Sequence, residues 1–174
     1  ATRYLISLGH RDIWFIGDTS LPWYRNRHEG YCKAMKDAGL EPLSQTLGLS
    51  DDRFLNGVNS VQMILEQHRR MTAVLAGNDE VADGVWERLQ KAHMNVPHDV
   101  SLIGFDDQHG MARLQSLTSV RVDAIEIGRQ LAKMAVAKIK SKGRRLPEVL
   151  LSTNLVKRET CRPLLQVEAK TEAK

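Results

Sequence analysis

The stretch V-S-L-I-G-F-D-D, which runs from Val100 to Asp107, decides the fold of this chain. A short apolar run that ends in polar residues is typical of a strand buried on both faces of a parallel sheet. Two further stretches have the same shape, I-W-F-I-G-D at residues 13–18 and A-V-L-A-G-N-D at residues 73–79. The carboxyl ends of parallel strands share one edge of an open α/β sheet, where ligands bind. We therefore expect the polar residues after these three strands to meet in one functional site.

Helical patterns alternate with the strands along the chain. Apolar residues recur at helical spacing, and Gly9 and Gly39 each follow the last apolar residue of a helix as a stop signal. Strands that alternate with helices through right-handed crossovers predict an α/β fold, with a mostly parallel sheet covered by helices on both faces. The other expected elements are helices at 26–38, 54–65 and 82–89, and strands at 44–47, 117–122 and 149–156.

Residue preferences add three local expectations. Residues 22–24, P-W-Y, are expected in a loop before the helix at 26–38. Ser50 or Asp51 is expected to cap the next helix. Asp123, with Glu126 three residues later, resembles a capping box that opens a further helix. The expected packed face of that helix consists of Gly128, Leu131, Ala132, Ala135 and Ile139.

Composition describes an ordinary globular chain. Its 174 residues are 42% hydrophobic and 26% charged, with a formal net charge of +4, which permits acidic partners without requiring them. Its two cysteines, Cys32 and Cys161, lie in separate elements, which favours a reduced, cytoplasmic protein. No apolar run approaches the roughly 18 residues of a membrane span. Residues 2–10 resemble the end of a helix already under way, so we expect further sequence upstream.

Motifs for several kinds of chemistry are absent from the sequence. There is no G-x-G-x-x-G, no G-x-x-x-x-G-K-[ST] and no G-x-S-x-G, so the common phosphate loops and the nucleophile elbow are missing. The histidines show no zinc spacing, and His93 and His98 beside Pro97 are expected in a surface loop rather than at a metal. A basic cluster at 138–145 is expected to complement a helix end rather than to bind nucleic acid. We expect no metal, no cofactor and no enzymatic activity.

With these residues in view, the chain resembles the C-terminal part of the effector core of LacI/GalR-family transcriptional regulators. That core has the type I fold of periplasmic sugar-binding proteins, which this chain would represent incompletely. The similar stretches follow one another in family order and cover nearly the whole chain up to Arg158. They are Y-L-I-S-L-G-H-R-D-I-W-F-I-G at 4–17, R-N-R-H-E-G-Y at 25–31, A-G-L at 38–40, A-V-L-A-G-N-D at 73–79, V-P-H-D-V-S-L-I-G-F-D-D at 96–107, L-T-S-V at 117–120 and L-V-K-R at 155–158.

The resemblance implies a division of the chain and a longer parent protein. Residues 1–121 would form the C-terminal effector subdomain, and residues 122–145 a crossover helix that belongs to the N-terminal effector subdomain. Residues 146–163 would return to the C-terminal subdomain, and residues 164–174 are expected to form a disordered tail. Operator DNA would be bound by a helix-turn-helix headpiece absent from this chain. A homodimer is implied, and we expect its surface to include residues 80–92 and 108–114.

Carried over position by position, the family's ligand-binding residues fall on Arg27, Asn78 and Asp106. The chemistry agrees, because a guanidinium can donate two parallel hydrogen bonds to vicinal hydroxyls, a carboxylate accepts from hydroxyls, and an amide does both. Trp23 is a fourth candidate, since its ring suits the apolar face of a sugar. Packing of Trp23 against the loop is nearly as well supported.

Bland interpretations remain open for several of these residues. Asp79 and Asp107 are expected to cap the structures that follow them rather than to bind ligand. Asn78 and Asp106 are alternatively plain loop residues. Two departures from the family pattern, Leu49 in a lengthened loop and Val122 on the crossover strand, leave the identity of the ligand undecided.

The expected function is therefore a sugar-sensing or polyol-sensing domain of a LacI-type regulator, in which the small-molecule effector closes two subdomains and alters operator binding. The first alternative is a periplasmic sugar-binding protein of a transporter, which has the same fold. The second is an α/β enzyme that uses Asp106 and Asp107 as acid and base or as metal ligands. Against the enzyme, no accompanying nucleophile or metal-spaced histidine is visible.

Overall fold

The computed structural model describes residues 1–46, 48, 50–108, 115–141 and 145–164. In these ranges the chain forms a six-stranded sheet in the order β2-β1-β3-β4-β5-β6, and every neighbouring pair is parallel except β5 and β6. This arrangement confirms the mostly parallel α/β sheet. The strands are β1 (Ile13–Ile16), β2 (Leu43–Gln45), β3 (Ala73–Ala76), β4 (Ser101–Asp106), β5 (Thr118–Arg121) and β6 (Asn154–Val156).

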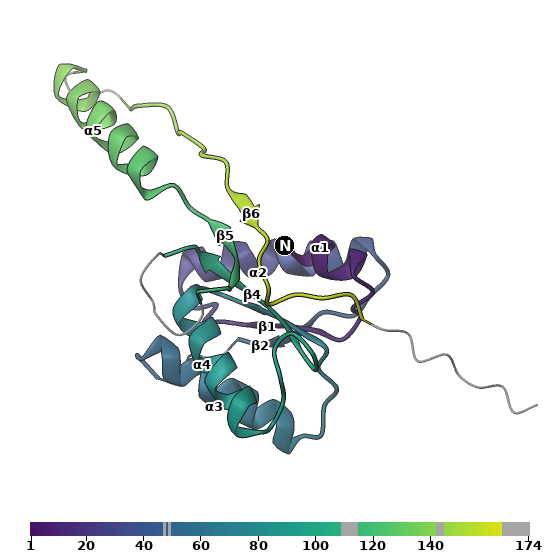
Figure 1. Ribbon diagram of the computed structural model, residues 1–174. Helices are drawn as coiled ribbons and strands as arrows, with labels where there is room; N and C mark the ends of the chain where they lie inside the picture. The colour runs from purple at the N-terminus through teal and green to yellow at the C-terminus, as the bar shows by residue number, and fades with distance from the viewer. Residues whose placement is uncertain (47, 49, 109–114, 142–144, 165–174) are drawn as a thin grey trace, which may run out of the picture.

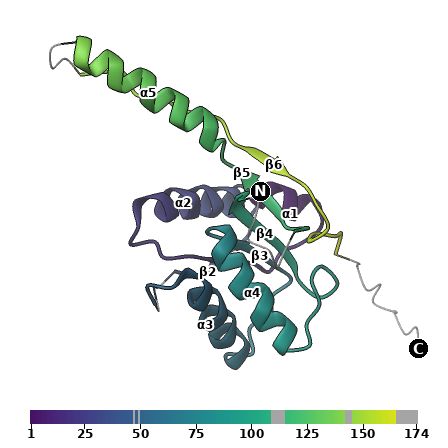
Figure 2. The ribbon, with the colours of Figure 1, turned by 60° about the vertical axis from the view of Figure 1, so that its left-hand side comes forward.

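Helices cover both faces of the sheet, as expected. In Figure 1 and in the turned view of Figure 2, α1 and α2 lie on one face, α3 and α4 lie on the other, and α5 stands away from the sheet. No helix in the described ranges combines the length and the apolar character needed to cross a bilayer. The helices are α1 (Thr2–Ser7), α2 (Pro22–Asp37), α3 (Arg53–Glu66), α4 (Asp79–Lys91) and α5 (Ala124–Lys140).

The core has two parts because side chains alternate across the sheet. On β1, Trp14 and Ile16 pack in the cluster that also contains α3 and α4 residues, whereas Ile13 and Phe15 pack in the cluster with α1 and α2 residues. All four are at most 3% exposed. A strand buried on both faces reads as a continuous apolar run, which is why I-W-F-I could be recognised in the sequence.

Helices α3 and α4 pack backbone to backbone through two glycines. A Cβ atom on Gly84 would lie 1.9 Å from the carbonyl oxygen of Phe54, and one on Gly57 would lie 2.2 Å from that of Val81. Only a residue without a side chain fits at these crossings. The close approach fixes how the start of α4 is presented at the carboxyl edge of the sheet.

Two helix starts differ from the expectation. Helix α2 begins at Pro22, so Trp23 and Tyr24 lie in its first turn rather than in a loop. Proline suits the first helical position because its missing N–H would have no partner there. Helix α3 is capped by Asp52, whose side chain accepts from the Leu55 N–H, and not by Ser50 or Asp51.

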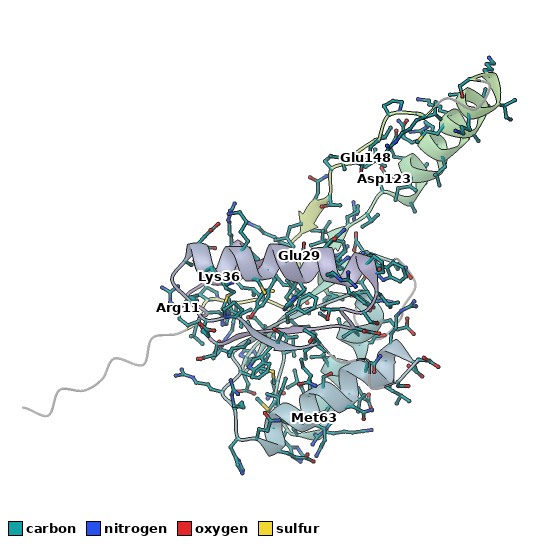
Figure 3. The ribbon with its side chains drawn as sticks, turned by 180° about the vertical axis from the view of Figure 1, so that it is seen from behind. Arg11, Glu29, Lys36, Met63, Asp123 and Glu148 are labelled. Carbon is teal, nitrogen blue, oxygen red and sulfur yellow. The ribbon has the colours of Figure 1, made fainter. Side chains whose placement is uncertain are left out.

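Stop and start signals elsewhere are confirmed. Gly9 and Gly39 have φ values of +92° and +68°, the left-handed conformation that ends a helix. Asp123 caps α5 by accepting a hydrogen bond from the Glu126 N–H at 2.9 Å. Figure 3 places Asp123 at the start of α5, with Glu148 on the segment that returns beside it.

A projecting arm consists of α5 and the extended segment that leads back to β6. The expected packed face of α5 is not buried, since no residue of this helix is buried. Apolar side chains are instead displayed to solvent, with Ile125 77%, Ile139 81% and Leu150 88% exposed. The strand expected at 149–156 is confined to Asn154–Val156, because the preceding residues lie beyond the reach of β5. The tail expected at 164–174 falls outside the described residues except at Leu164.

Candidate functional site

A polar hollow of about 420 Å³ opens at the carboxyl edge of the sheet. It lies where β3 and β4 end and where α2, α3 and α4 begin, and its lining residues belong to β4, to the three helices and to the positions next to these elements. All four residues singled out from the sequence lie in its wall. The lining residues are Trp23, Tyr24, Arg27, Arg53, Asn78, Asp79, Glu80, Asp106 and Gln108.

Arg27 is held in place by contacts on three sides. Its Nη1 donates to the Gly77 carbonyl oxygen at 2.5 Å, and its Nη2 donates to Asp106 Oδ1 at 2.8 Å. The guanidinium also lies over the Phe105 ring, 3.7 Å from the centroid, where a cation is attracted to the ring face. The side chains of Arg27 and Asp106 are only 18% and 23% exposed, so the charged pair faces the hollow in a fixed orientation.

Asp106 ends β4 in an unusual backbone conformation. Its φ of +102° and the φ of +53° at Asp107 place two consecutive non-glycine residues in the left-handed region. Burial raises the pKa of the Asp106 carboxyl, and the neighbouring Arg27 opposes that rise. Strain of this kind persists where surrounding contacts hold it, and it is concentrated at binding sites.

Asn78 is the N-cap of α4 and also faces the hollow. Its Oδ1 accepts from the Val81 N–H at 2.9 Å. Among the described residues the side-chain NH₂ has no acceptor, so it can donate to a ligand. The expectation that Asp79 caps this helix is wrong. Asp79 instead accepts from Ser119 Oγ at 2.6 Å and from the Gln108 N–H at 2.9 Å. Burial raises the pKa of Asp79.

Asp107 points away from the hollow and is not a cap either. Its carboxylate, with a side chain only 4% exposed, accepts from Arg121 Nε at 2.6 Å and pairs with Arg158 Nη2 at 2.7 Å. Burial acts to raise the pKa of Asp107, but the hydrogen bonds from the two arginines outweigh it and hold the pKa below its usual value. Arg121 ends β5 and Arg158 follows β6, so this one carboxylate joins both strands at the base of the arm.

Trp23 and Tyr24 contribute differently to the wall. Trp23 is 48% exposed at the rim, where its ring is available for stacking. Tyr24 is buried against Gly77, where any Cβ atom would lie 2.6 Å from the tyrosine ring. Burial raises the pKa of Tyr24 to about 12, and its hydroxyl has no hydrogen-bond partner among the described residues.

The sequence-based selection missed Tyr24, Arg53 and Glu80. Tyr24 precedes Arg27 by three positions, so it shares a helix face with Arg27 once the start of α2 at Pro22 is known. Arg53 and Glu80 lie in the first turns of α3 and α4, and their side chains pair at 3.5 Å across the hollow. Their selection required the relative position of two helices, which the sequence does not display.

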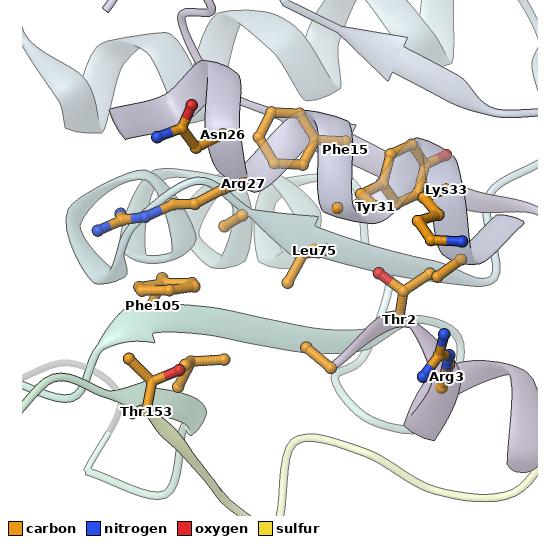
Figure 4. A pocket seen from close by; sticks show the side chains of 15 residues that line it. Thr2, Arg3, Phe15, Asn26, Arg27, Tyr31, Lys33, Leu75, Phe105 and Thr153 are labelled. Atoms are coloured by element: carbon orange, nitrogen blue, oxygen red, sulfur yellow. The ribbon is translucent and has the colours of Figure 1, made fainter. Parts of the chain in front are cut away.

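A second hollow of about 470 Å³ is also lined by Arg27 (Figure 4). Its labelled wall includes Phe15, Tyr31, Leu75 and Phe105, which are apolar or aromatic. Arg27 is the only one of the four selected residues that it contains. The polar hollow is the better candidate for a hydroxyl-rich ligand, because its Asn78 amide can donate to hydroxyls and its Asp106 carboxylate can accept from them.

No group of three or more His, Cys, Asp or Glu side chains arranged for a metal ion occurs among the residues that the structure describes. The lining of the polar hollow offers hydrogen-bonding groups and two guanidinium groups, those of Arg27 and Arg53. His93 and His98 both lie in the loop region that follows α4, as expected, and the latter pairs with Arg162.

The chain is similar to a described family of domains and to curated regulators. The family described as "Periplasmic binding protein-like domain" matches residues 2–161. The chain is 31% identical over 162 residues to the HTH-type transcriptional repressor PurR of Serratia proteamaculans, covering 92% of this chain and 48% of that protein. It is 30% identical over 163 residues to the ribose operon repressor of Haemophilus influenzae, covering 92% and 49%.

Solved structures give the same picture. A LacI-family transcriptional regulator from Enterococcus faecium with bound ribose superposes with a TM-score of 0.82 at 25% identity, covering 94% of this chain and 61% of that one. The chain spans about half the length of the curated relatives that it matches. The likeness therefore concerns one part of those proteins.

Proposed function

Because the chain belongs to the periplasmic binding protein-like domain family, as the C-terminal part of a LacI-type effector core, we propose that it senses a sugar or related polyol for a DNA-binding regulator. The observation that carries this proposal is the convergence of Arg27, Asn78 and Asp106 on one polar hollow. A guanidinium, an amide and a carboxylate at one site form the donor and acceptor set that sugar hydroxyls require. The ribose bound to the Enterococcus faecium regulator is a ligand of this class.

The arm supports the proposed division of the chain at about residues 121 and 145. A surface helix normally buries one apolar face, yet α5 displays Ile125, Leu131 and Ile139 to solvent. In the full-length regulator this face packs against the N-terminal effector subdomain, to which residues 122–145 belong. Residues 146–163 then return the chain to the C-terminal subdomain.

The mechanism follows from the position of the hollow. A ligand held by Arg27, Asn78 and Asp106 contacts the second subdomain across the cleft and favours the closed arrangement. It changes operator binding only if its affinity for the closed state exceeds that for the open state. Operator DNA is bound by the headpiece of the parent protein, which acts as a cytoplasmic homodimer. The proposed dimer surface includes residues 80–92 and 108–114, of which residues 109–114 lie outside the described ranges.

The alternative of a transporter's binding protein has less support, because the relatives found are transcriptional regulators. The same finding argues against the α/β enzyme. In addition, Asp107 is occupied by Arg121 and Arg158, so it does not form an acid–base pair with Asp106.

A thermal-shift screen of sugars, polyols and nucleosides on the full-length regulator tests the proposal. A ligand at 100 times its dissociation constant adds about 2.7 kcal/mol to the free energy of unfolding, which is readily detected. We expect a hit among the neutral sugars or polyols. An electrophoretic mobility-shift assay with operator DNA then identifies the role of the ligand. An inducer weakens operator binding, whereas a corepressor strengthens it.

Arg27→Ala places the hit in the hollow. It removes a partly buried, hydrogen-bonded guanidinium, so we expect ligand affinity to fall by at least about tenfold, or 1.4 kcal/mol. Arg70→Ala is the matched control, because Arg70 is 75% exposed and lies before the amino end of β3. A hit whose affinity is unchanged by Arg27→Ala contradicts the proposed site.

A further inference from the structure

The charges that line the polar hollow are already matched to one another. Arg27 pairs with Asp106 at 2.8 Å, and Arg53 pairs with Glu80 at 3.5 Å. Asp79 is satisfied by the Ser119 hydroxyl and the Gln108 N–H, both uncharged donors. Within the described lining, three carboxylates therefore face two guanidinium groups, and neither guanidinium is without a carboxylate partner.

The start of α4 is closed to anions for a separate reason. A helix N-terminus ordinarily attracts phosphate, because its first N–H groups lack partners and carry partial positive charge. Here Asn78 Oδ1 occupies the Val81 N–H. Asp79 and Glu80 supply two negative charges in the first helical turn. The helix end that faces the hollow is thus complemented by the protein itself.

Uncharged hydroxyls can form hydrogen bonds with the polar groups of the hollow that have no partner among the described residues. The Asn78 side-chain NH₂ can donate, and Asp106 Oδ2 can accept, since no hydrogen bond within the described ranges uses either. A hydroxyl both donates and accepts, so one sugar hydroxyl can bridge such a pair. A phosphate offers only acceptors at neutral pH and would meet Asp106, Asp79 and Glu80 with like charge.

From these contacts we propose that the hollow is selective for uncharged polyols and rejects the phosphate esters of the same sugars. The inference rests on the proposed sugar-sensing function and names the ligand class within it. The side chains of Asp106 and Glu80 are 23% and 32% exposed, so they repel an added dianion in a hollow that dissolved salt can reach and partly screen. The selectivity is therefore electrostatic in origin and depends on Glu80, which holds Arg53.

Matched ligand pairs test the inference by isothermal titration of the full-length regulator: ribose against ribose 5-phosphate, and glucose against glucose 6-phosphate. We expect the ester to bind at least about tenfold more weakly than its parent sugar, with a deficit that shrinks as salt is raised. An ester that binds as tightly as its parent sugar overturns the inference. A deficit that does not change with salt also overturns it, because the cause would then be steric.

Glu80→Gln provides a second, independent readout. It frees Arg53 and removes one negative charge, so we expect the affinity for the ester to rise by at least about threefold and that for the neutral sugar to change less. Glu41→Gln, the same charge change at an exposed position near the amino end of β2, is the control and is expected to leave the deficit as it was. Equal effects of the two variants contradict the role of Glu80.

The outcomes separate this inference from the proposed function. If neutral sugars bind in a manner that depends on Arg27 but their esters bind equally well, the sensor function stands and the inference fails. If no sugar or polyol in the thermal-shift screen binds, and ribose and glucose therefore do not bind either, the sugar-sensing proposal fails and takes the inference with it.

Discussion

Asp106 and Asp107 are adjacent in the chain, yet their carboxylates serve different parts of the molecule. Asp106 accepts from Arg27 in the wall of the polar hollow, whereas Asp107 accepts from Arg121 and Arg158 at the base of the arm. Both residues have positive φ values, +102° and +53°, and this backbone turn directs the two side chains apart. The residue that faces the hollow is thereby joined by one peptide bond to the residue that anchors the arm.

Asp107→Asn is expected to destabilise the protein by about 2 kcal/mol, because it leaves two arginines with a neutral, weaker acceptor in a buried site. The carboxylate is nearly inaccessible, with 4% side-chain exposure, although Arg121 is 47% exposed and part of the loss is screened by solvent. Urea unfolding followed by circular dichroism measures the change.

Asp37→Asn serves as the control for that substitution. Asp37 also pairs with two cations, Lys33 and Arg3, but on the open surface of α2, so we expect no measurable change. Similar losses for the two variants would show that burial of Asp107 adds nothing to its ion pairs.

His10 is expected to make stability fall on mild acidification. Burial lowers the pKa of this histidine, which outweighs the hydrogen bond between its Nε2 and the Arg162 carbonyl oxygen. The unfolded chain takes up a proton at about pH 6.5 that the folded state refuses, so the free energy of unfolding drops as pH falls from there toward the lower folded pKa. One such group changes stability by at most about 1.4 kcal/mol per pH unit.

Urea unfolding between about pH 7.5 and about pH 5.5 tests this slope. His10→Gln keeps a side-chain donor for the Arg162 carbonyl and should flatten the dependence. Burial also lowers the pKa of His28, so part of the slope should persist. His98→Gln, at an exposed position, is the control; a slope that His10→Gln leaves intact would assign the effect elsewhere.

Gly84→Ala is expected to cost about 3 kcal/mol or more, because the added methyl would meet the Phe54 carbonyl oxygen at 1.9 Å and force α3 and α4 apart. Gly30→Ala, in α2 with nothing within 4 Å of its Cβ position, should instead stabilise the fold by about 0.5 to 1 kcal/mol through helix propensity. Thermal melts of the two variants give the comparison. Equal shifts would mean that the helices tolerate the wider spacing.

Hydrogen exchange should divide the chain at the base of the arm. None of the residues of α5 is buried, whereas α4 buries Val81, Val85 and Leu89. Isolated helices of this length are marginal in water. In the 174-residue chain we expect α5 amides to exchange at least about 100-fold faster than those of α4. Equal protection in the two helices would contradict the assignment of α5 to a missing subdomain interface.

The strands and the site were predictable where a local pattern carries the information. The runs at 13–16 and 73–76 are apolar because both faces of those strands are covered, and their carboxyl ends mark the edge where Asn78 and Asp106 lie. The role of Asp79 could not be predicted, because it depends on a residue that is distant in the sequence. Asp79 is a residue type that often caps helices, but its carboxylate accepts a hydrogen bond from Ser119, which lies 40 positions away in the chain. The start of α2 was misplaced because P-W-Y suits either a loop or a first helical turn.

The face of α5 failed for a different reason. Its apolar spacing is that of a packed helix, yet no residue of α5 is buried against the elements of this sheet. Apolar residues at helical spacing predict that one face of a helix is covered, but they do not identify the element that covers it. The three-dimensional structure is needed to show that α5, which lies between β5 and β6 in the chain, projects away from the sheet (Figure 1).

The antiparallel pairing of β5 with β6 makes the two roots of the arm a single pivot. Helix α5, at 17 residues, is a rod about 25 Å long. A tilt of about 10° at the pivot would therefore displace the far end sideways by about 4 Å. A small rotation beside Asp107 is thus magnified along α5 into a sideways movement of its tip.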